Sequence, residues 1–399
     1  MSEKLIIRNF GPIKEVELDL KKFNVIIGEN ATGKSIVAKI LGMCRYFSYI
    51  INNYSTEQPF KEGLQARGLN EFINKNTYIR YECIHYDFEI KRDKETVPNR
   101  EEEDGSYYNH EVEFFSSRLK KKSDEFKKLI EELDSIKPKQ DGEYNLSFSD
   151  WNIPTSFFLN DVSKVLDNPF YLPTERGLQS IFSLGKNSIA NISDSLFNQL
   201  AELDSIARNF KNETVIEPLE ITYKNVDGRG YFKKEGQHDF LSLYNGASGY
   251  KSAIPIVLVV KYYNELKKKK KTFIVEEPEL NLFPSIQKEL VNYLAKEAKN
   301  FGNTILLTTH SPYILTSLNN LMFAYQTGQS NGEDIDKIID KKYWVNPADV
   351  SAYMMFPNGE CKSIIDREGL IKTEKIDNIS QILNKEFNEM FDIELAVKK

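Results

Sequence analysis

The sequence is poor in the residues that define disulfide-rich, metal-binding and membrane-spanning proteins. Its 399 residues include only three cysteines, Cys44, Cys83 and Cys361, which are far apart and form no CxxC pair. Neither a disulfide framework nor a zinc site is therefore indicated. No apolar run approaches the roughly 20 residues that a membrane helix requires, and the first residues lack the apolar core of a signal peptide. We expect a cytoplasmic protein with no membrane partner.

The chain also lacks an excess of basic residues, because its formal net charge is −6. A protein that is basic over its whole surface is excluded, so any contact with nucleic acid has to be local. Two local clusters qualify, Lys267–Lys271 and the lysines from Lys120 to Lys128. A solvated loop at the end of a helix is the simpler reading of Lys267–Lys271, and lysines there also complement the dipole of the preceding helix. Nucleic-acid binding therefore stays an open alternative.

A complete phosphate-binding P-loop, Gly-Glu-Asn-Ala-Thr-Gly-Lys-Ser, occupies residues 28–35. A short apolar run precedes it and apolar residues at helical spacing follow it, which supplies the strand and the helix that the motif requires. In such a loop the lysine, Lys34, reaches the β- and γ-phosphates and the hydroxyl of Ser35 ligates Mg²⁺. We predict ATP and Mg²⁺ as cofactors. The predicted nucleotide-binding residues here are Gly28, Glu29, Asn30, Ala31, Thr32, Gly33, Lys34, Ser35 and Ile36.

Three later segments also carry residues suited to phosphate chemistry. Residues 272–277 read as a β-rich strand that ends in paired acids, the Walker B arrangement, in which one carboxylate serves the Mg²⁺ shell and another polarises water. Residues 304–310 read as a buried strand that ends in a histidine. Residues 245–252 place small residues before an apolar helix, which suits an anion but also fits an ordinary N-cap.

These motifs, in this order, resemble the ATP-binding-cassette (ABC) ATPases of the SMC, RecF and OLD (overcoming lysogenisation defect) group. The start of the chain is similar too, because a strand ending in Arg8-Asn9-Phe10 and a second strand precede the P-loop. The resemblance implies an α/β P-loop fold of ABC-ATPase type, with a mixed central sheet, an N-terminal antiparallel β-layer and a helical insertion. Two positions depart from the family pattern: Lys251 replaces a glutamine and Phe283 replaces a histidine.

The resemblance also implies roles for the acids and the histidine. Glu276 would join Ser35 at the metal, Glu277 would be the catalytic base, and His310 would be the switch histidine that contacts the γ-phosphate. With Lys34, they would make up the catalytic group.

The remaining implied site residues lie between the P-loop and the Walker B strand. Ser248 and Gly249 of the signature-like motif would bind the nucleotide of the opposite protomer. Arg176, which with Glu175 follows a strand near the position of the cassette Q-loop, is a candidate for sensing nucleotide or for coupling it to a lid. A structural salt bridge at the end of that strand is an equal alternative.

The expected division of the chain has five parts. They are an N-terminal β-layer and P-loop lobe (1–55), an insertion with β-strands and a short coiled-coil stub (56–168), a Q-loop-like segment with a helical subdomain and the signature motif (169–270), a lobe with Walker B and the switch histidine (271–326), and a small C-terminal β/α addition (327–399). Within them we expect strands over 77–92, a polar loop over 93–109, a helix over 111–136 and a last helix over 379–391.

For function, the resemblance implies an ATP-hydrolysing homodimer with composite sites, with a higher oligomer left open. It also implies a separate effector, a nuclease or toxin from the same operon, as in bacterial anti-phage systems. The alternative is a RecF- or SMC-like clamp that grips DNA, and a non-hydrolysing nucleotide switch is a third reading. A C-terminal Toprim nuclease is not expected, because the one nearby D-x-D pair, Asp334 and Asp336, lies in a polar stretch without a preceding strand.

Overall fold

The structure is a computed structural model. It describes residues 3–45, 63–65, 67–98, 109–121, 124, 127, 169–182, 194–372 and 385–390. Within these residues, no helix combines the length and the apolar character that crossing a membrane requires.

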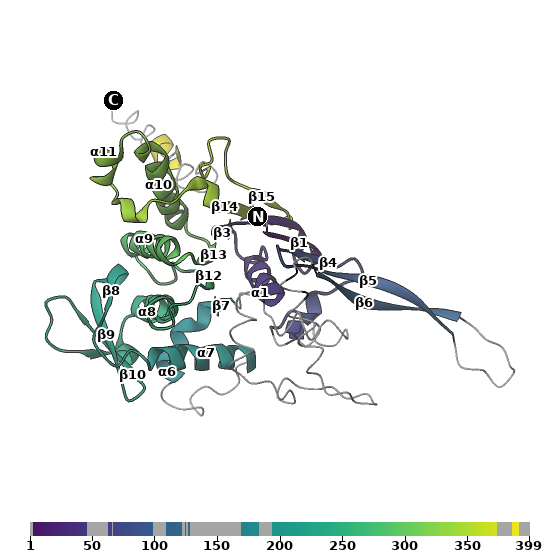
Figure 1. Cartoon of the computed structure of the whole chain (residues 1–399), viewed down its shortest axis with the longest axis horizontal. Coiled ribbons are helices and arrows are strands. Elements are labelled where there is room, and N and C mark those ends of the chain that lie inside the picture. The colour runs from purple at the N-terminus through teal and green to yellow at the C-terminus, as the bar shows by residue number, and fades with distance from the viewer. Residues whose placement is uncertain are drawn as a thin grey trace.

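A six-stranded sheet forms the centre of the molecule (Figure 1), in the order β15-β14-β3-β13-β12-β7. The strands from β14 to β7 are parallel, and β15 runs antiparallel at the edge. Their bounds are β3 (Phe23–Gly28), β7 (Phe170–Leu172), β12 (Thr272–Glu276), β13 (Thr304–Thr309), β14 (Val350–Met355) and β15 (Cys361–Ser363). All five residues of β12 are buried, as in parallel sheets covered on both faces.

The two faces of this sheet are covered by different layers. Because side chains alternate along a strand, Phe273 and Val275 of β12 pack into one hydrophobic core and Ile274 packs into the other. The first core contains α8 (Ser248–Lys261) and the second contains the P-loop helix α1 (Lys34–Arg45). The helices α7 (Asp194–Ala207), α9 (Pro284–Phe301) and α10 (Pro312–Gly328) share the face of α8. The P-loop helix and the signature-like helix therefore lie on opposite faces of the sheet.

An antiparallel sheet, in the order β2-β1-β4-β5-β6, covers the α1 side and confirms the N-terminal β-layer. Its strands are β1 (Glu3–Phe10), β2 (Ile13–Leu20), β4 (Tyr78–Glu82), β5 (Tyr86–Pro98) and β6 (Asn109–Lys121). The ends of β5 and β6 extend from the body as a two-stranded ribbon (Figure 1). The strands expected over residues 77–92 are thus confirmed.

The helix expected over residues 111–136 is wrong for residues 111–121, which belong to β6. The apolar residues there are spaced as on one face of a helix, but pairing with β5 makes the segment a strand. The pairing is long: its register runs from Asn109 opposite Pro98 to Lys121 opposite Tyr86. Asp124 and Lys127 are helical, and the rest of the expected stub lies outside the described residues. The expected loop over 93–109 is wrong for residues 93–98, which belong to β5, and for Asn109, where β6 begins.

A third, small antiparallel sheet packs beside α8, in the order β11-β10-β9-β8. It consists of β8 (Thr214–Ile216), β9 (Ile221–Val226), β10 (Arg229–Lys234) and β11 (Leu241–Ser242). At the other end of the chain, β14 and β15 complete the central sheet. The helix expected over 379–391 is described for residues 385–390, which are helical. The structure also contains the short helices α6 (Gln179–Phe182) and α11 (Gly332–Asp336).

Candidate nucleotide-binding site

The P-loop connects the carboxyl end of β3 to α1 and curls tightly against its neighbours. A Cβ atom on Gly28 would lie 2.5 Å from the carbonyl oxygen of Met355, and one on Gly33 would lie 2.9 Å from Cγ1 of Ile13. Gly33 also has a φ of +101°, which L side chains rarely adopt. Both glycines of the motif are therefore required by the path of the chain. Along the loop, Glu29, Asn30 and Ala31 are exposed, Thr32 and Ile36 are buried, and Ser35 is half-buried.

Lys34 is the first residue of α1, and its side chain turns back over the loop. Its ammonium donates hydrogen bonds to the carbonyl oxygens of Gly28 and Glu29, each at 2.8 Å. The hydroxyl of Thr32 also donates to the Glu29 carbonyl, at 2.9 Å. Burial lowers the pKa of Lys34, and the nearby carboxylates oppose this effect. The loop thus holds a cation at the place where the motif binds phosphate.

The two acids of the Walker B segment lie at the carboxyl end of β12 and differ in environment. Glu276 is 3% exposed, and among the described residues its Oε1 atom has no hydrogen bond. The hydroxyl of Tyr171 is likewise buried, and it has no hydrogen-bond partner in the described part of the chain. Its burial, together with the charge of Glu276, raises the pKa of Tyr171 well above its usual value. The side chain of Glu277 is 28% exposed, so it can meet water.

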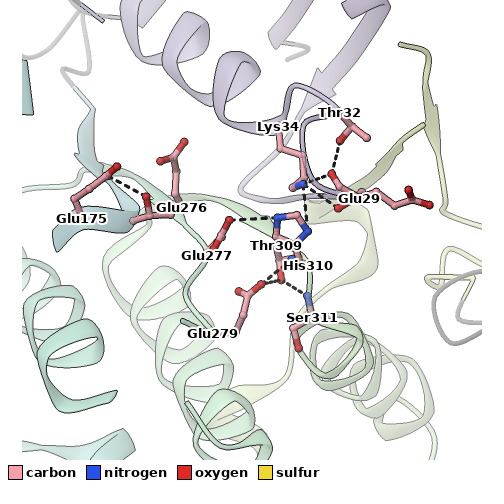
Figure 2. A network of polar contacts seen from close by, with 12 residues as sticks. Glu29, Thr32, Lys34, Glu175, Glu276, Glu277, Glu279, Thr309, His310 and Ser311 are labelled. Atoms are coloured by element: carbon pink, nitrogen blue, oxygen red, sulfur yellow. Dashed lines mark hydrogen bonds and ion pairs between the residues drawn. The ribbon is translucent and has the colours of Figure 1, made fainter. Parts of the chain in front are cut away.

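His310 links the P-loop to the Walker B segment (Figure 2). Its Nε2 lies 3.2 Å from Oε1 of Glu277, and its Nδ1 lies 3.4 Å from the ammonium of Lys34. A neutral imidazole with its proton on Nε2 satisfies both contacts, because it donates to the carboxylate and accepts from the ammonium. The parallel pairing of β12 with β13 brings these residues to the same edge of the sheet.

Glu279 holds the segment that carries His310, and our reading of the sequence missed this residue. Its Oε1 accepts hydrogen bonds from the Thr309 hydroxyl and from the backbone N–H of His310, each at 2.7 Å. The signal available in the sequence was a third acid, two residues after Glu277, in the run Glu-Glu-Pro-Glu. A carboxylate that fixes the backbone of the histidine leaves the imidazole free for Lys34 and Glu277.

The structure joins Arg176 to the backbone of the Walker B acids and leaves Ser248 of the signature-like motif exposed. Arg176 is fully buried behind the acids, and its hydrogen bonds go to backbone carbonyls. Among the described residues it forms no ion pair with a carboxylate, so the salt bridge left open by the sequence is not observed. Ser248 is exposed at the start of α8. A Cβ atom on Gly249 would lie 2.8 Å from the carbonyl oxygen of Asn281, so α8 packs closely on the segment that follows the Walker B acids.

Comparison with known families agrees with this geometry. A family model described as "AAA ATPase domain" matches residues 1–154 and 46–315, which together cover more than half of the chain. The chain belongs to the AAA ATPase domain family. The P-loop, the acid pair and His310 all lie inside the matched part of this ATPase domain. The expected α/β P-loop fold with a mixed central sheet is confirmed, and the structure shows that this sheet is mostly parallel.

Several solved structures are similar to this ATPase domain at low identity. An SMC head bound to the C-winged helix domain of ScpA is 13% identical, with 79% of this chain and 91% of that chain covered and a TM-score of 0.42. The SMC head domain from Thermotoga maritima is 12% identical over 79% and 91%, with a TM-score of 0.35. The Smc head domain with an extended coiled coil, bound to the C-terminal domain of ScpA and derived from Pyrococcus furiosus, is 11% identical over 96% and 99%, with a TM-score of 0.40. No curated protein matches the chain.

The residues at the site of this ATPase domain fit a nucleoside triphosphate and its magnesium ion. Magnesium is usually held by one or two protein oxygens together with substrate phosphates and water. The buried Oε1 of Glu276, which has no hydrogen bond among the described residues, is an acceptor of the kind that a cation satisfies. No group of three histidine, cysteine or acidic side chains suited to a metal occurs in the described part of the chain. A magnesium site that relies on phosphate oxygens is therefore the type that these residues support.

Proposed function

We propose that this protein binds ATP with Mg²⁺ and hydrolyses it, as an ABC-type ATPase that forms a homodimer around the nucleotide. One observation carries the proposal: His310 contacts both the P-loop lysine Lys34 and the acid Glu277. The lysine binds the phosphates, and the acid takes a proton from the attacking water. A residue in contact with Lys34 and Glu277 fixes the distance between them. In-line phosphoryl transfer depends on that distance.

In this mechanism each residue has a separate task. The backbone N–H groups of the P-loop and the Lys34 ammonium bind the β- and γ-phosphates. Ser35 and Glu276 would hold Mg²⁺, which supplies positive charge to the phosphate oxygens when bound. Glu277 takes a proton from the attacking water, and its exposure lets water reach it. His310 orients Glu277 and lies where it can contact the γ-phosphate.

The position of α8 supports the composite site. Ser248 and Gly249 lie on the face of the sheet opposite α1, so a second copy would complete the site that Lys34 begins. Two exposed aromatic side chains, Phe283 (76% exposed) and Tyr313 (53% exposed), lie at the starts of α9 and α10. These helices follow the carboxyl ends of β12 and β13. Aromatic side chains are enriched in interfaces, so they support contact between copies there.

The biological role follows from the resemblance to stand-alone OLD-like ATPases of anti-phage systems. We infer that the homodimer scaffolds or restrains a separate effector in the cytoplasm.

Asp334 and Asp336 lie on the short α11, and their carboxylates engage Lys337 and the backbone of Lys341. This supports our expectation that they do not form a Toprim metal site. The five-part division of the chain also stays a proposal.

A DNA-gripping clamp of the RecF or SMC type is the second candidate. The observation that favours it is the exposed run Lys267–Lys270, whereas Lys271, which precedes β12, is buried. Four adjacent exposed lysines suit a phosphate backbone.

A single preparation tests both candidates. The protein is purified from its own operon, tagged and carrying Glu277→Gln, and the mass and composition of what accompanies it are measured. We expect ATP to be bound and its turnover to fall by at least about 100-fold, as for loss of a general base. Glu235→Gln, at an exposed glutamate in the turn after β10, is the matched control.

The outcomes separate the candidates. A second polypeptide at fixed stoichiometry supports the scaffold, whereas a bare dimer that carries nucleic acid supports the clamp. Unchanged turnover in Glu277→Gln would contradict the proposed base.

A further inference from the structure

Arg176 connects three segments that are far apart in the sequence. It lies in a short 3-10 turn, Thr174–Leu178, directly after β7. Its Nη1 donates to the carbonyl oxygens of Glu276 at 2.7 Å and of Pro173 at 2.9 Å. Its Nη2 donates to the carbonyl of Glu277 at 2.7 Å, and its Nε donates to the carbonyl of Ser252 in α8 at 2.8 Å. One planar group therefore joins the edge strand, the acid pair and the signature-like helix.

One of the four carbonyl groups that Arg176 binds belongs to Glu277, a residue with a strained backbone. Glu277 has a φ of +41°, a conformation that residues other than glycine adopt rarely and that persists only where the surroundings impose it. Both of its backbone polar groups are fixed. Its N–H donates to the carbonyl of Thr308 at 2.8 Å, and its carbonyl accepts from Arg176. This backbone turn places the carboxylate of Glu277 next to His310.

The environment of Arg176 suits a role in positioning and not in contacting nucleotide. The side chain is fully buried, and burial lowers its pKa to about 10, so it stays charged at neutral pH. Four of its five N–H groups already donate to carbonyls. A lysine could not reproduce this arrangement, because its donors share one nitrogen atom, whereas the guanidinium presents a rigid fork.

We propose that Arg176 is a positioning residue that holds the backbone of Glu277 in its strained conformation and ties it to the amino-terminal part of α8. This inference rests on the proposed function, in which α8 binds the nucleotide of the second copy. A displacement of α8 when the copies meet is then transmitted through one side chain to the catalytic base. Because α8 serves the nucleotide of the second copy, each composite site is thereby coupled to the catalytic base of the other composite site.

The test compares Arg176→Lys with the wild-type full-length chain in two measurements. The first is hydrogen–deuterium exchange without nucleotide. We expect exchange to rise in peptides that cover residues 276–280 and 248–253, and to stay unchanged in a peptide that covers β13. The second is steady-state ATP hydrolysis with a separate measurement of ATP affinity. Loss of charge-assisted hydrogen bonds predicts a fall in kcat of at least about 10-fold, with ATP affinity retained.

The matched control is Arg208→Lys, at an arginine of which the guanidinium is half-exposed and paired with Asp204. It should change neither measurement. If Arg176→Lys does not fold, Arg176→Gln, which keeps an N–H donor but removes the charge, is measured in the same way.

Three results would overturn the proposal: wild-type kcat, a loss of ATP affinity equal to the loss of kcat, or exchange that rises across the whole sheet. The first shows that the contacts do not matter for turnover, the second shows a direct nucleotide contact, and the third shows general destabilisation. Absence of turnover in the wild-type protein would instead reject the proposed function. The exchange measurement would still decide whether Arg176 holds Glu277.

Discussion

Nε2 of His310 lies 3.2 Å from Oε1 of Glu277, although the two residues follow different strands, β13 and β12. The other nitrogen of the same ring lies 3.4 Å from the ammonium of Lys34. One imidazole therefore fixes the position of the proposed base, Glu277, relative to the phosphate-binding lysine, Lys34. The ring makes both contacts at once when its proton is on Nε2, because it then donates to the carboxylate and accepts from the ammonium.

Replacing His310 tests directly whether its ring positions Glu277 relative to Lys34. We expect His310→Ala to lower kcat by about 100-fold, because Glu277 loses the group that orients it and the γ-phosphate loses a contact. ATP affinity should change little, since the P-loop remains intact. Steady-state hydrolysis and equilibrium ATP binding measure the two effects. His238→Ala, at an exposed histidine outside the site, is the control, and equal losses in both variants would contradict the assignment.

The pair Glu279→Gln and Glu279→Ala separates the hydrogen bonds of Glu279 from its charge. The glutamine retains an acceptor for the Thr309 hydroxyl and the His310 N–H, so we expect a small loss of turnover. The alanine leaves both donors unpaired at a cost of about 1–3 kcal/mol each, and we expect kcat to fall by at least about 10-fold. Thermal unfolding is measured alongside. Equal effects of the two substitutions would show that charge, and not hydrogen bonding, is what matters.

Gly249→Ala tests the packing of α8 against the segment after the acid pair. The new Cβ would lie 2.8 Å from the backbone carbonyl of Asn281, and backbone cannot move aside as a flexible side chain does. We expect a loss of about 1–3 kcal/mol of folding free energy, as for overpacked sites, and reduced ATP turnover. Chemical denaturation gives the first value. Gly332→Ala, where no atom lies within 4 Å of the new Cβ, should be neutral, and an unaffected Gly249→Ala would refute the close approach.

The parts of the site that the sequence predicts are those built from local motifs. A strand, the loop of residues 28–35 and a helix fix the P-loop geometry among themselves, so Lys34 could be placed without knowledge of the fold. The meeting of Glu277 with His310 was also foreseeable, because both follow strands of one parallel sheet and the carboxyl ends of such strands share an edge. The resemblance to the ABC ATPases added the expected roles of Glu276 and of the signature-like motif.

Other features could not be predicted because their partners are backbone atoms or distant strands. Arg176 binds four carbonyl oxygens, and a carbonyl leaves no mark in a sequence. The β6 strand carries apolar residues that fit a helical period equally well, and only its long pairing with β5 selects the extended form. Tertiary context overrides local pattern in such segments.

The exposed lysines Lys267–Lys270 separate the two candidate functions. They precede the amino end of β12, whereas the nucleotide site lies at its carboxyl end, so neutralising them should leave ATP turnover unchanged. Under the scaffold proposal, we expect the wild-type protein to show little affinity for duplex DNA. If it acts as a clamp, its binding weakens as salt rises, and replacing all four lysines by glutamine reduces the logarithmic salt dependence by about 0.9 for each DNA phosphate that is no longer neutralised. Binding that persists after replacement would place the DNA-binding surface elsewhere. Lys337→Gln with Lys342→Gln, at exposed lysines already paired with acids, is the control.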